Sequence, residues 1–281
     1  MVKILSLDDF TAMVKAFQKG NPKGFTNCFL MPDELKTLIQ CDCIYVSQQK
    51  DWFFIVCERC DYYNLYFYSS ASPCTPDIDE IAERFNDKQI FVDVVLREGI
   101  SKSNYALNVL LENEIVVPYK SYKRMNFVQK TSDDKPYQDA QMYRMVCEYG
   151  DTEALFSLWK SALDEKSTPL PLKKDVLALE KEGKILYIVD KDNYLCAVGM
   201  LNVQGRNALI KHIAVSSLHR RKGLAKYIVS KLIDLSTKKE MRTLKLWVDC
   251  ENIPAVKLYD KIGFVNDGMI CNQFEFKTKG I

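Results

Sequence analysis

The stretch HRRKGLAKYIVSKLI, residues 219–233, sets three cations and a glycine directly before an apolar-periodic segment that is typical of an amphipathic helix. The strand-like run IKHIAV, residues 210–215, leads into it. The first turn of a helix has N–H groups without intrahelical partners and carries the positive end of the helix dipole. A strand, a glycine turn and a helix start in this order predict a site for a phosphate-like anion.

The turn itself has the residue types that such a site needs. Gly223 has no Cβ and Ala225 has only a methyl group, so backbone N–H groups between Arg221 and Ala225 can approach phosphate oxygens closely. Exposed cations add attraction, although each contributes modestly in water. The alternative is a solvated basic turn without a ligand. The candidate anion-binding residues are Arg220, Arg221, Lys222, Gly223, Leu224 and Ala225.

Charge and hydrophobicity exclude several classes of protein. The 39 Lys and Arg nearly balance the 37 Asp and Glu, and a net charge of +2 gives no basic stripe for nucleic acid. Acidic residues interrupt the N-terminal MVKILSLDDF, and no run reaches the roughly 18 apolar residues that a membrane span needs. We therefore expect a cytoplasmic protein with no nucleic-acid or membrane partner.

The 10 cysteines are scattered along a chain of 281 residues, which is typical of reduced thiols. The group Cys41, Cys43, Cys57 and Cys60 is the densest, because a hairpin turning near residue 50 would bring Cys43 opposite Cys57. In extended strands, however, Cys57 and Cys60 point to opposite faces. The sequence therefore predicts no metal site, and zinc at this group stays the alternative.

Two halves of the chain have a similar predicted order of strands and helices, and the polar stretch 128–141 separates them. We expect an N-terminal domain over 1–130 and a C-terminal domain over 138–281. Mixed strand and helix order predicts an α/β (α+β mixed) fold, with tandem sheets flanked by helices. A local test supports duplication, since positions 103–115 match 252–264 at a constant offset of 149; the alternative is a chance match between two amphipathic helices that follow strands. The residues that match are Ser103, Ala106, Val109, Leu110, Glu114 and Ile115 with Asn252, Ala255, Leu258, Tyr259, Gly263 and Phe264.

Residues 142–279 resemble the GNAT superfamily of acetyl-CoA-dependent N-acetyltransferases. The pyrophosphate loop of that family reads Gln or Arg, two residues, Gly, one residue, Gly or Ala, and Arg220, Gly223 and Ala225 match this spacing. A second family motif, Asn-x-x-Ala-x-x-Leu-Tyr-x-x-x-Gly-Phe, is complete over 252–264. Both motifs occur in the order of the family, separated by one helix and one strand.

This resemblance implies a splayed mixed sheet in which the pantetheine arm of acetyl-CoA enters between the fourth and fifth strands. The fourth strand would be IKHIAV, and the N–H of Val215 would polarise the thioester carbonyl. Asn252 joins the loop residues as a predicted cofactor-binding residue. The implied reaction is transfer of acetyl to a primary amine of a small molecule, amino acid or peptide, by direct attack in a ternary complex.

An amine acceptor must lose a proton, because its ordinary pKa of about 10.4 leaves it mostly charged at pH 7. His212 shares a strand face with Ala214 and is the candidate base, while Asp249 or Glu251 could act through water. Tyr259 stands where the family motif places a tyrosine that protonates the leaving thiolate. The sequence thus predicts His212 and Tyr259 as catalytic residues.

The N-terminal half departs from the family pattern. Its segment ASPCTP, residues 71–76, has neither glycine nor cation, and Leu110 stands where Tyr259 stands in the second half. We expect a degenerate GNAT-like lobe that binds no cofactor, with an unrelated α+β domain as the alternative. A non-catalytic acyl-CoA-binding regulatory module is the alternative to an enzyme, and the chain is expected to be a monomer or homodimer.

Overall fold

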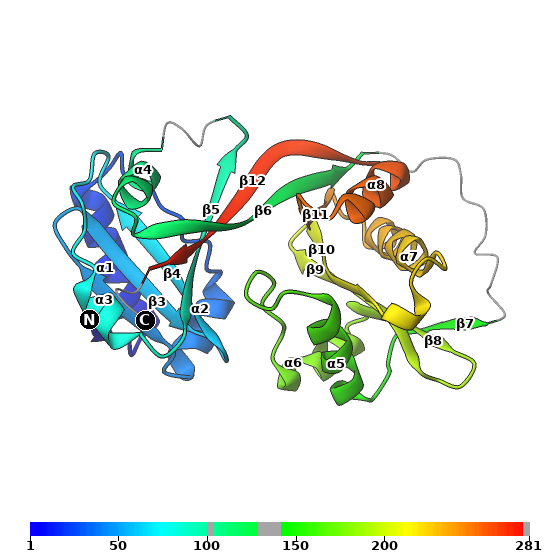
Figure 1. The fold of residues 1–281 in the computed structure, drawn as a ribbon. Coiled ribbons are helices and arrows are strands. Elements are labelled where there is room, and N and C mark those ends of the chain that lie inside the picture. Colours follow the sequence, from blue (N-terminus) through cyan, green and yellow to red (C-terminus); the bar gives the residue numbers. More distant parts are fainter. Residues whose placement is uncertain (100–103, 129–141, 278–281) are drawn as a thin grey trace. The chain divides into compact units, whose positions relative to one another are not determined.

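The computed structural model describes residues 1–99, 104–128 and 142–277. The chain divides into two compact units: unit 1 is Met1–Ser121 with Met269–Ile281, and unit 2 is Tyr122–Gly268 (Figure 1). Ser103 and most of the expected linker, residues 129–141, lie outside the described residues. Among the described residues, no helix is both long enough and apolar enough to cross a membrane.

Unit 1 contains the elements that its sequence patterns predict. Two of its helices begin at residues whose side chains cap them: Ser6 accepts a hydrogen bond from the N–H of Asp9, and Asn104 accepts one from the N–H of Leu107. The elements of the N-terminal half are β1 (Val2–Lys3), α1 (Leu7–Gly20), α2 (Pro32–Gln40), β2 (Ile44–Gln48), β3 (Trp52–Glu58), β4 (Tyr62–Ser69), α3 (Asp79–Arg84), β5 (Gln89–Arg97), α4 (Tyr105–Glu112) and β6 (Val116–Phe127), and the last part of β6 belongs to unit 2.

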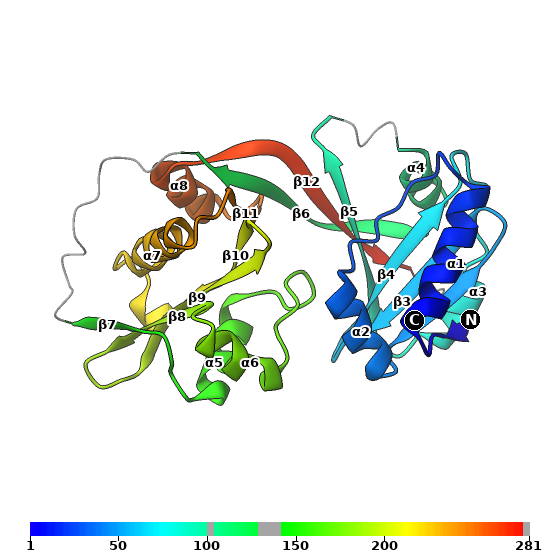
Figure 2. The same cartoon turned by 180° about the vertical axis from the view of Figure 1, so that it is seen from behind.

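The C-terminal half repeats this order of helices and strands (Figure 2), and among the described residues it also has a 3-10 turn, η2, before α7. The elements of the C-terminal half are β7 (Tyr143–Val146), α5 (Thr152–Ala162), α6 (Lys173–Lys181), β8 (Ile185–Asp190), β9 (Leu195–Gln204), β10 (Asn207–Val215), η2 (Ser217–His219), α7 (Leu224–Lys238), β11 (Thr243–Asp249), α8 (Ile253–Ile262) and β12 (Phe264–Phe276), and the last part of β12 belongs to unit 1. The strand order in the two units is also equivalent, β1-β2-β3-β4-β5 and β7-β8-β9-β10-β11.

Each unit has a mixed sheet, as expected. Neighbouring strands are antiparallel except for β4 with β5 and β10 with β11, which are parallel. The parallel pairs are short: they end at Asn64↔Phe91 in unit 1 and at Ile210↔Leu246 in unit 2. Beyond these points the fourth strand of each unit no longer pairs with the fifth. The tandem α/β architecture predicted from the order of elements is confirmed.

The last strands of the two halves are exchanged. β12 pairs with β5 from Met269↔Arg97 to Phe276↔Ile90, and β6 pairs with β11 from Lys245↔Asn126 to Asp249↔Tyr122. Each half therefore completes its sheet beside its fifth strand with a strand from the other half. Because of this exchange, Met269–Ile281 group with unit 1 and residues 122–127 with unit 2, while the domains 1–130 and 138–281 stay a prediction.

Helices cover both faces of the sheet in unit 2. The apolar side of α7, including Ile228 and Leu232, packs in one buried cluster with β9, β10, β11 and α8. Gly199 on β9 allows this close approach, because a Cβ there would lie 3.0 Å from the Leu232 side chain. A second cluster joins α5, with the fully buried Trp159, to β8, β9 and β10. The sheet is thus held rigidly at β10, which leads into the predicted anion loop.

Candidate functional site

The predicted anion loop connects η2 to α7. Gly223 is the N-cap of α7 with φ 78°, a left-handed conformation that favours glycine, and no side chain caps the helix. The first turn of this 15-residue helix therefore offers backbone N–H groups and the positive end of a long helix dipole. Arg221 also has a positive φ of 64°. The local backbone is shaped as the sequence predicts for an anion site.

The predicted loop residues differ in what they can offer a ligand. Arg220, Arg221 and Lys222 are exposed, and the Nε of Arg220 donates to the carbonyl of Val215 at 3.4 Å. Leu224, in contrast, has its side chain buried in the core cluster, so only its backbone can face a ligand. The loop combines exposed cations with a helix start anchored in the core.

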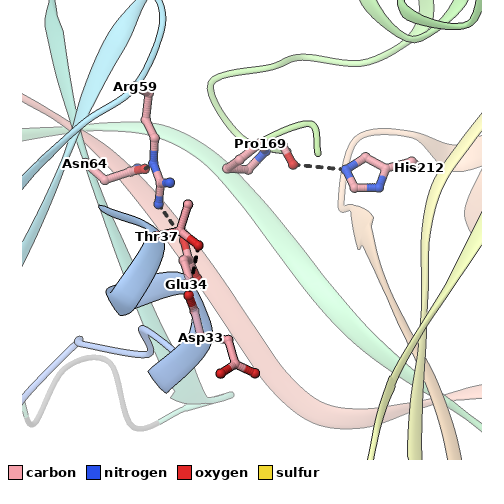
Figure 3. Close-up of polar contacts among 7 residues, drawn as sticks. All are labelled: Asp33, Glu34, Thr37, Arg59, Asn64, Pro169 and His212. Atoms are coloured by element: carbon pink, nitrogen blue, oxygen red, sulfur yellow. Dashed lines mark hydrogen bonds and ion pairs between the residues drawn. The ribbon is translucent and has the colours of Figure 1, made fainter. Parts of the chain in front are cut away.

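A bulge interrupts β10 between Lys211 and Ala214, and His212 sits in it with φ 53°. The indole N–H of Trp159 donates to the His212 carbonyl at 3.0 Å, and the two rings are 5.4 Å apart. Figure 3 shows the imidazole Nε2 against the Pro169 carbonyl, at 3.0 Å. Because a carbonyl only accepts, Nε2 carries the proton and Nδ1 has a free lone pair. Among the described residues, buried Nδ1 has no hydrogen-bond partner.

Burial lowers the pKa of His212 to about 4; the charge of Lys211 adds to this effect and the bond to Pro169 opposes it. The imidazole is therefore neutral at pH 7. It accepts protons more weakly than an exposed histidine would, which limits it as a base. Trp159 and Pro169 hold this side chain, and no pattern in the sequence connects either residue with it.

The lowered pKa predicts acid sensitivity. The unfolded chain binds a proton at His212 below about pH 6.5, whereas the folded chain binds it only near pH 4, so the free energy of unfolding should fall as pH drops. We expect this group to account for a loss of roughly 3 kcal/mol between pH 7 and pH 4. Denaturant unfolding of the wild type and His212→Gln across this range measures the difference. Equal pH dependence in both proteins would contradict it; His219→Gln is the control.

The N–H of Val215 faces the side of β10 on which pairing with β11 has ended. Val215 lies opposite Ala197 on β9, while the N–H of the next residue, Ser216, donates to the carbonyl of Cys196 at 2.9 Å. In an antiparallel pair, successive N–H groups point to alternate sides of the strand. The Val215 N–H therefore points away from β9, as a group that polarises a carbonyl in the gap must.

The second sequence motif forms α8 and its two ends. The side chain of Asn252 is the N-cap and accepts from the N–H of Ala255 at 3.2 Å, while Gly263 ends the helix with φ 110°. Tyr259 is buried, with its ring 6.0 Å from that of Phe264. Burial raises its pKa to about 12, so the hydroxyl keeps its proton at pH 7 and is available as a donor.

The structure brings some predicted site residues together and separates others. Val215, Leu224 and Tyr259 belong to one apolar cluster, on the face covered by α7 and α8. His212 instead contacts Trp159 of α5, on the other face of the sheet. Asp249 and Glu251 interact with each other at the end of β11, where the Asp249 carboxylate accepts from the Glu251 N–H. The candidate base His212 and the candidate acid Tyr259 thus lie on opposite faces of the sheet.

In unit 1, the corresponding loop between β4 and α3 is already hydrogen-bonded by side chains of the β2–β3 turn and of the loop itself. Gln49 accepts from the N–H of Asp77 and donates to its carbonyl, and the Asp77 carboxylate accepts from the N–H of Asp79. Asp51 accepts from the N–H of Cys74. The helix that follows, α3, has only six residues. Carboxylate oxygens thus already accept from backbone N–H groups that a bound anion would need.

The gap between β4 and β5 is filled from within unit 1. Asn27, fully buried, donates to the carbonyls of Leu65 on β4 and Asp93 on β5, and accepts from the N–H of Phe67. Thr26 also pairs with Tyr68. This segment of chain lies where the resemblance places a pantetheine arm. Figure 3 shows that the nearby cation Arg59 is engaged by Glu34 and Asn64.

The motif of α8 has a counterpart in α4 without its tyrosine. Leu110, at the position equivalent to Tyr259, is buried as well, and Glu114, equivalent to Gly263, has a positive φ of 54°. The offset of 149 is thus supported at the C-terminal ends of the helices. At their starts the N-caps are Asn104 and Asn252, so α4 begins one residue later than the offset predicts; α4 has 8 residues and α8 has 10.

The cysteine group of unit 1 does not assemble. The register pairs Ile44 with Cys57, so Cys43 lies opposite Glu58 and not opposite Cys57. Cys57 is fully buried, whereas Cys41 and Cys60 are exposed. Within the described part of the chain, these four thiols form no cluster of metal ligands.

Comparisons with known proteins agree with this geometry. Residues 152–264 match the family model described as acetyltransferase (GNAT) family. Streptothricin acetyltransferase from Escherichia coli is 33% identical over 72 residues, and this match spans 26% of the chain and 40% of the relative.

Solved structures resemble nearly the whole chain. A GCN5-related N-acetyltransferase from Sphaerobacter thermophilus has a TM-score of 0.58 at 14% identity, covering 96% of this chain and 92% of that one. A GNAT-family acetyltransferase from Colwellia psychrerythraea has a TM-score of 0.55 at 16% identity, covering 98% of each chain. A tandem GNAT protein from the clavulanic acid biosynthesis pathway has a TM-score of 0.53 at 10% identity, covering 93% and 85%. These likenesses show the fold, and the match to the GNAT acetyltransferase family is to residues 152–264.

Proposed function

We propose that this protein is an N-acetyltransferase that moves acetyl from acetyl-CoA to a primary amine of a small molecule, amino acid or peptide. The observation that carries the proposal is the start of α7, where Gly223 in a left-handed conformation opens a long helix that no side chain caps. Exposed Arg220, Arg221 and Lys222 adjoin it. This combination suits the diphosphate of acetyl-CoA.

The chain's own residues supply the other roles. The Val215 N–H would donate to the thioester carbonyl oxygen as negative charge develops on it. The Tyr259 hydroxyl would donate to the departing sulfur, and the lone pair on His212 Nδ1 would accept the proton of the amine. Asn252, which caps α8, would contact the cofactor through its amide nitrogen. The acetyl group itself is supplied by acetyl-CoA.

A non-catalytic acyl-CoA-binding regulatory module is the second candidate. It needs the loop at α7 but not the tyrosine, so a Tyr259 variant distinguishes the two functions. The acceptor is proposed only as a class. Streptothricin acetyltransferase carries a small-molecule acceptor in its name, and its short match favours no acceptor for this chain over amino acids or peptides. A cytoplasmic location and a monomeric or homodimeric state stay predictions.

We expect one acetyl-CoA to bind per chain. In unit 1, side chains already accept from the N–H groups of the corresponding loop, and Asn27 fills the gap between β4 and β5. Calorimetric titration of the full chain with acetyl-CoA measures the stoichiometry, and titration with free CoA is the control. Two sites would show that unit 1 retains a donor site. Absence of binding would reject the proposed function.

A further inference from the structure

Three side chains with metal-ligating chemistry meet where the β8–β9 hairpin approaches η2. Asp190 ends β8, Cys196 lies at the start of β9 and His219 ends η2. One potential ligand atom from each residue lies within 4.8 Å of the others. Cys196 is buried and the other two are partly buried. Acetyl transfer, as proposed above, uses none of these side chains.

The carboxylate of Asp190 is oriented by the backbone of its own hairpin. Its Oδ1 accepts from the N–H groups of Asp192, at 3.0 Å, and Tyr194, at 2.9 Å. These two bonds fix the plane of the carboxylate. Within the described ranges, no hydrogen bond engages the second oxygen, Oδ2. The hairpin therefore presents one carboxylate oxygen with its direction already set.

The imidazole of His219 is oriented in the same way. Its Nδ1 lies 3.0 Å from the hydroxyl of Tyr143, and the two rings meet edge to face with centroids 5.7 Å apart. A metal-bound histidine usually has its second nitrogen held by such a partner, which directs the first nitrogen to the ion. Here Tyr143 holds Nδ1, so Nε2 is the nitrogen available as a ligand.

Backbone bonds bring Cys196 and His219 together. The Ser216 N–H donates to the Cys196 carbonyl and the His219 N–H donates to the Ser216 carbonyl, both at 2.9 Å. These contacts tie η2 to the first residues of β9. The three ligands thus come from two segments that hydrogen bonds already join.

We propose that Asp190, Cys196 and His219 bind one Zn²⁺, with water in the fourth position. A thiolate and an imidazole favour zinc over Mg²⁺ or Ca²⁺, which prefer oxygen ligands. Three protein ligands and one water match a tetrahedral zinc site. On binding, the Cys196 thiol loses its proton to solvent, and the neutral His219 keeps its proton on Nδ1, facing the Tyr143 oxygen.

The ion would fix the start of the proposed diphosphate loop, because His219 directly precedes Arg220. This consequence rests on the proposed function: removing the metal should weaken acetyl-CoA binding. The metal site itself does not depend on that function. Metal titration in the absence of acetyl-CoA therefore separates failure of this inference from failure of the proposed function.

Titration of the metal-free full chain with Co²⁺, followed by displacement with Zn²⁺, tests the site. We expect one ion per chain, tetrahedral d–d absorption and a thiolate-to-cobalt charge-transfer band. Cys196→Ser should abolish that band, whereas Cys147→Ser, at an exposed thiol in the same unit, should retain it. Absence of stoichiometric binding, or a charge-transfer band that persists in Cys196→Ser, would overturn the proposal.

Two milder variants keep the test independent of folding. Asp190→Asn retains an oxygen that accepts from Asp192 and Tyr194, and Tyr143→Phe retains the aromatic ring. Loss of an outer-shell partner typically costs about 10- to 100-fold in metal affinity, so Tyr143→Phe should weaken zinc by that factor at unchanged stoichiometry. Circular dichroism of each variant verifies its fold. Unchanged zinc affinity in both variants would contradict the assigned ligands.

Discussion

Replacing Tyr259 with phenylalanine is expected to lower kcat by about 10²- to 10⁴-fold, the range of general acid catalysis, while the Kd for acetyl-CoA stays unchanged. The substitution removes only the hydroxyl. The ring remains in the apolar cluster of α7 and α8 and keeps its contact with Phe264. A loss of rate without a loss of binding would therefore report the hydroxyl's role at the sulfur.

The size of this effect follows from the proton balance. Burial raises the pKa of Tyr259 to about 12, whereas a thiol has an ordinary pKa near 8.5. Complete transfer of the proton to a free thiolate is thus uphill by roughly 5 kcal/mol. The hydroxyl is most effective as a hydrogen-bond donor while charge develops on sulfur, and it transfers the proton as the bond to carbon breaks.

Steady-state kinetics with an accepted amine, combined with calorimetric Kd values, measures the two quantities separately. Tyr194→Phe is the control, because that side chain is 70% exposed and lies on the β8–β9 hairpin. Equal kcat in the wild type and Tyr259→Phe would remove the tyrosine from the mechanism. The His212→Gln variant of the pH series complements this comparison, since a base role requires lower kcat at unchanged acetyl-CoA affinity.

Local features of the site could be predicted from the sequence because local interactions determine them. Asn252 caps α8 and Gly263 ends it in a left-handed conformation, two effects that act within a few residues of the chain. The same holds for Gly223 at the start of α7. Spacing along the sequence records such features directly, so the motif residues were placed correctly on their elements.

Other features depend on contacts distant in sequence. His212 is held by Trp159 and Pro169, 53 and 43 residues away. Its burial follows the alternating pattern of β10, but that pattern predicts neither its bulge nor these two partners. The exchange of β6 and β12 also escapes sequence patterns, because either strand can pair beside either fifth strand. The β2–β3 hairpin likewise pairs Cys57 with Ile44 and not with Cys43, a register one residue away from the expected one.

Gly223→Val is expected to weaken acetyl-CoA binding by about 10²-fold or more. At φ 78° a β-branched residue is strained by about 1 to 3 kcal/mol, so the loop leaves the conformation that directs its N–H groups to one point. Loss of two charge-assisted hydrogen bonds costs about 3 kcal/mol at the low end, and each 1.4 kcal/mol is tenfold in Kd. Valine retains the backbone N–H, which proline would remove, so the variant changes the conformation and the space at the helix start but not the number of donors.

Gly205→Val is the matched control. Gly205 also has a positive φ, 58°, and a Cβ there would meet nothing within 4 Å, but it lies in the β9–β10 turn, away from the loop. Both variants therefore bear similar backbone strain, and only one alters the start of α7. If calorimetry gives the same Kd for Gly223→Val and Gly205→Val, the diphosphate does not bind at this helix. If only Gly223→Val loses affinity, acetyl-CoA binding requires glycine at the start of α7. The backbone then positions the anion, and the three cations beside it add attraction.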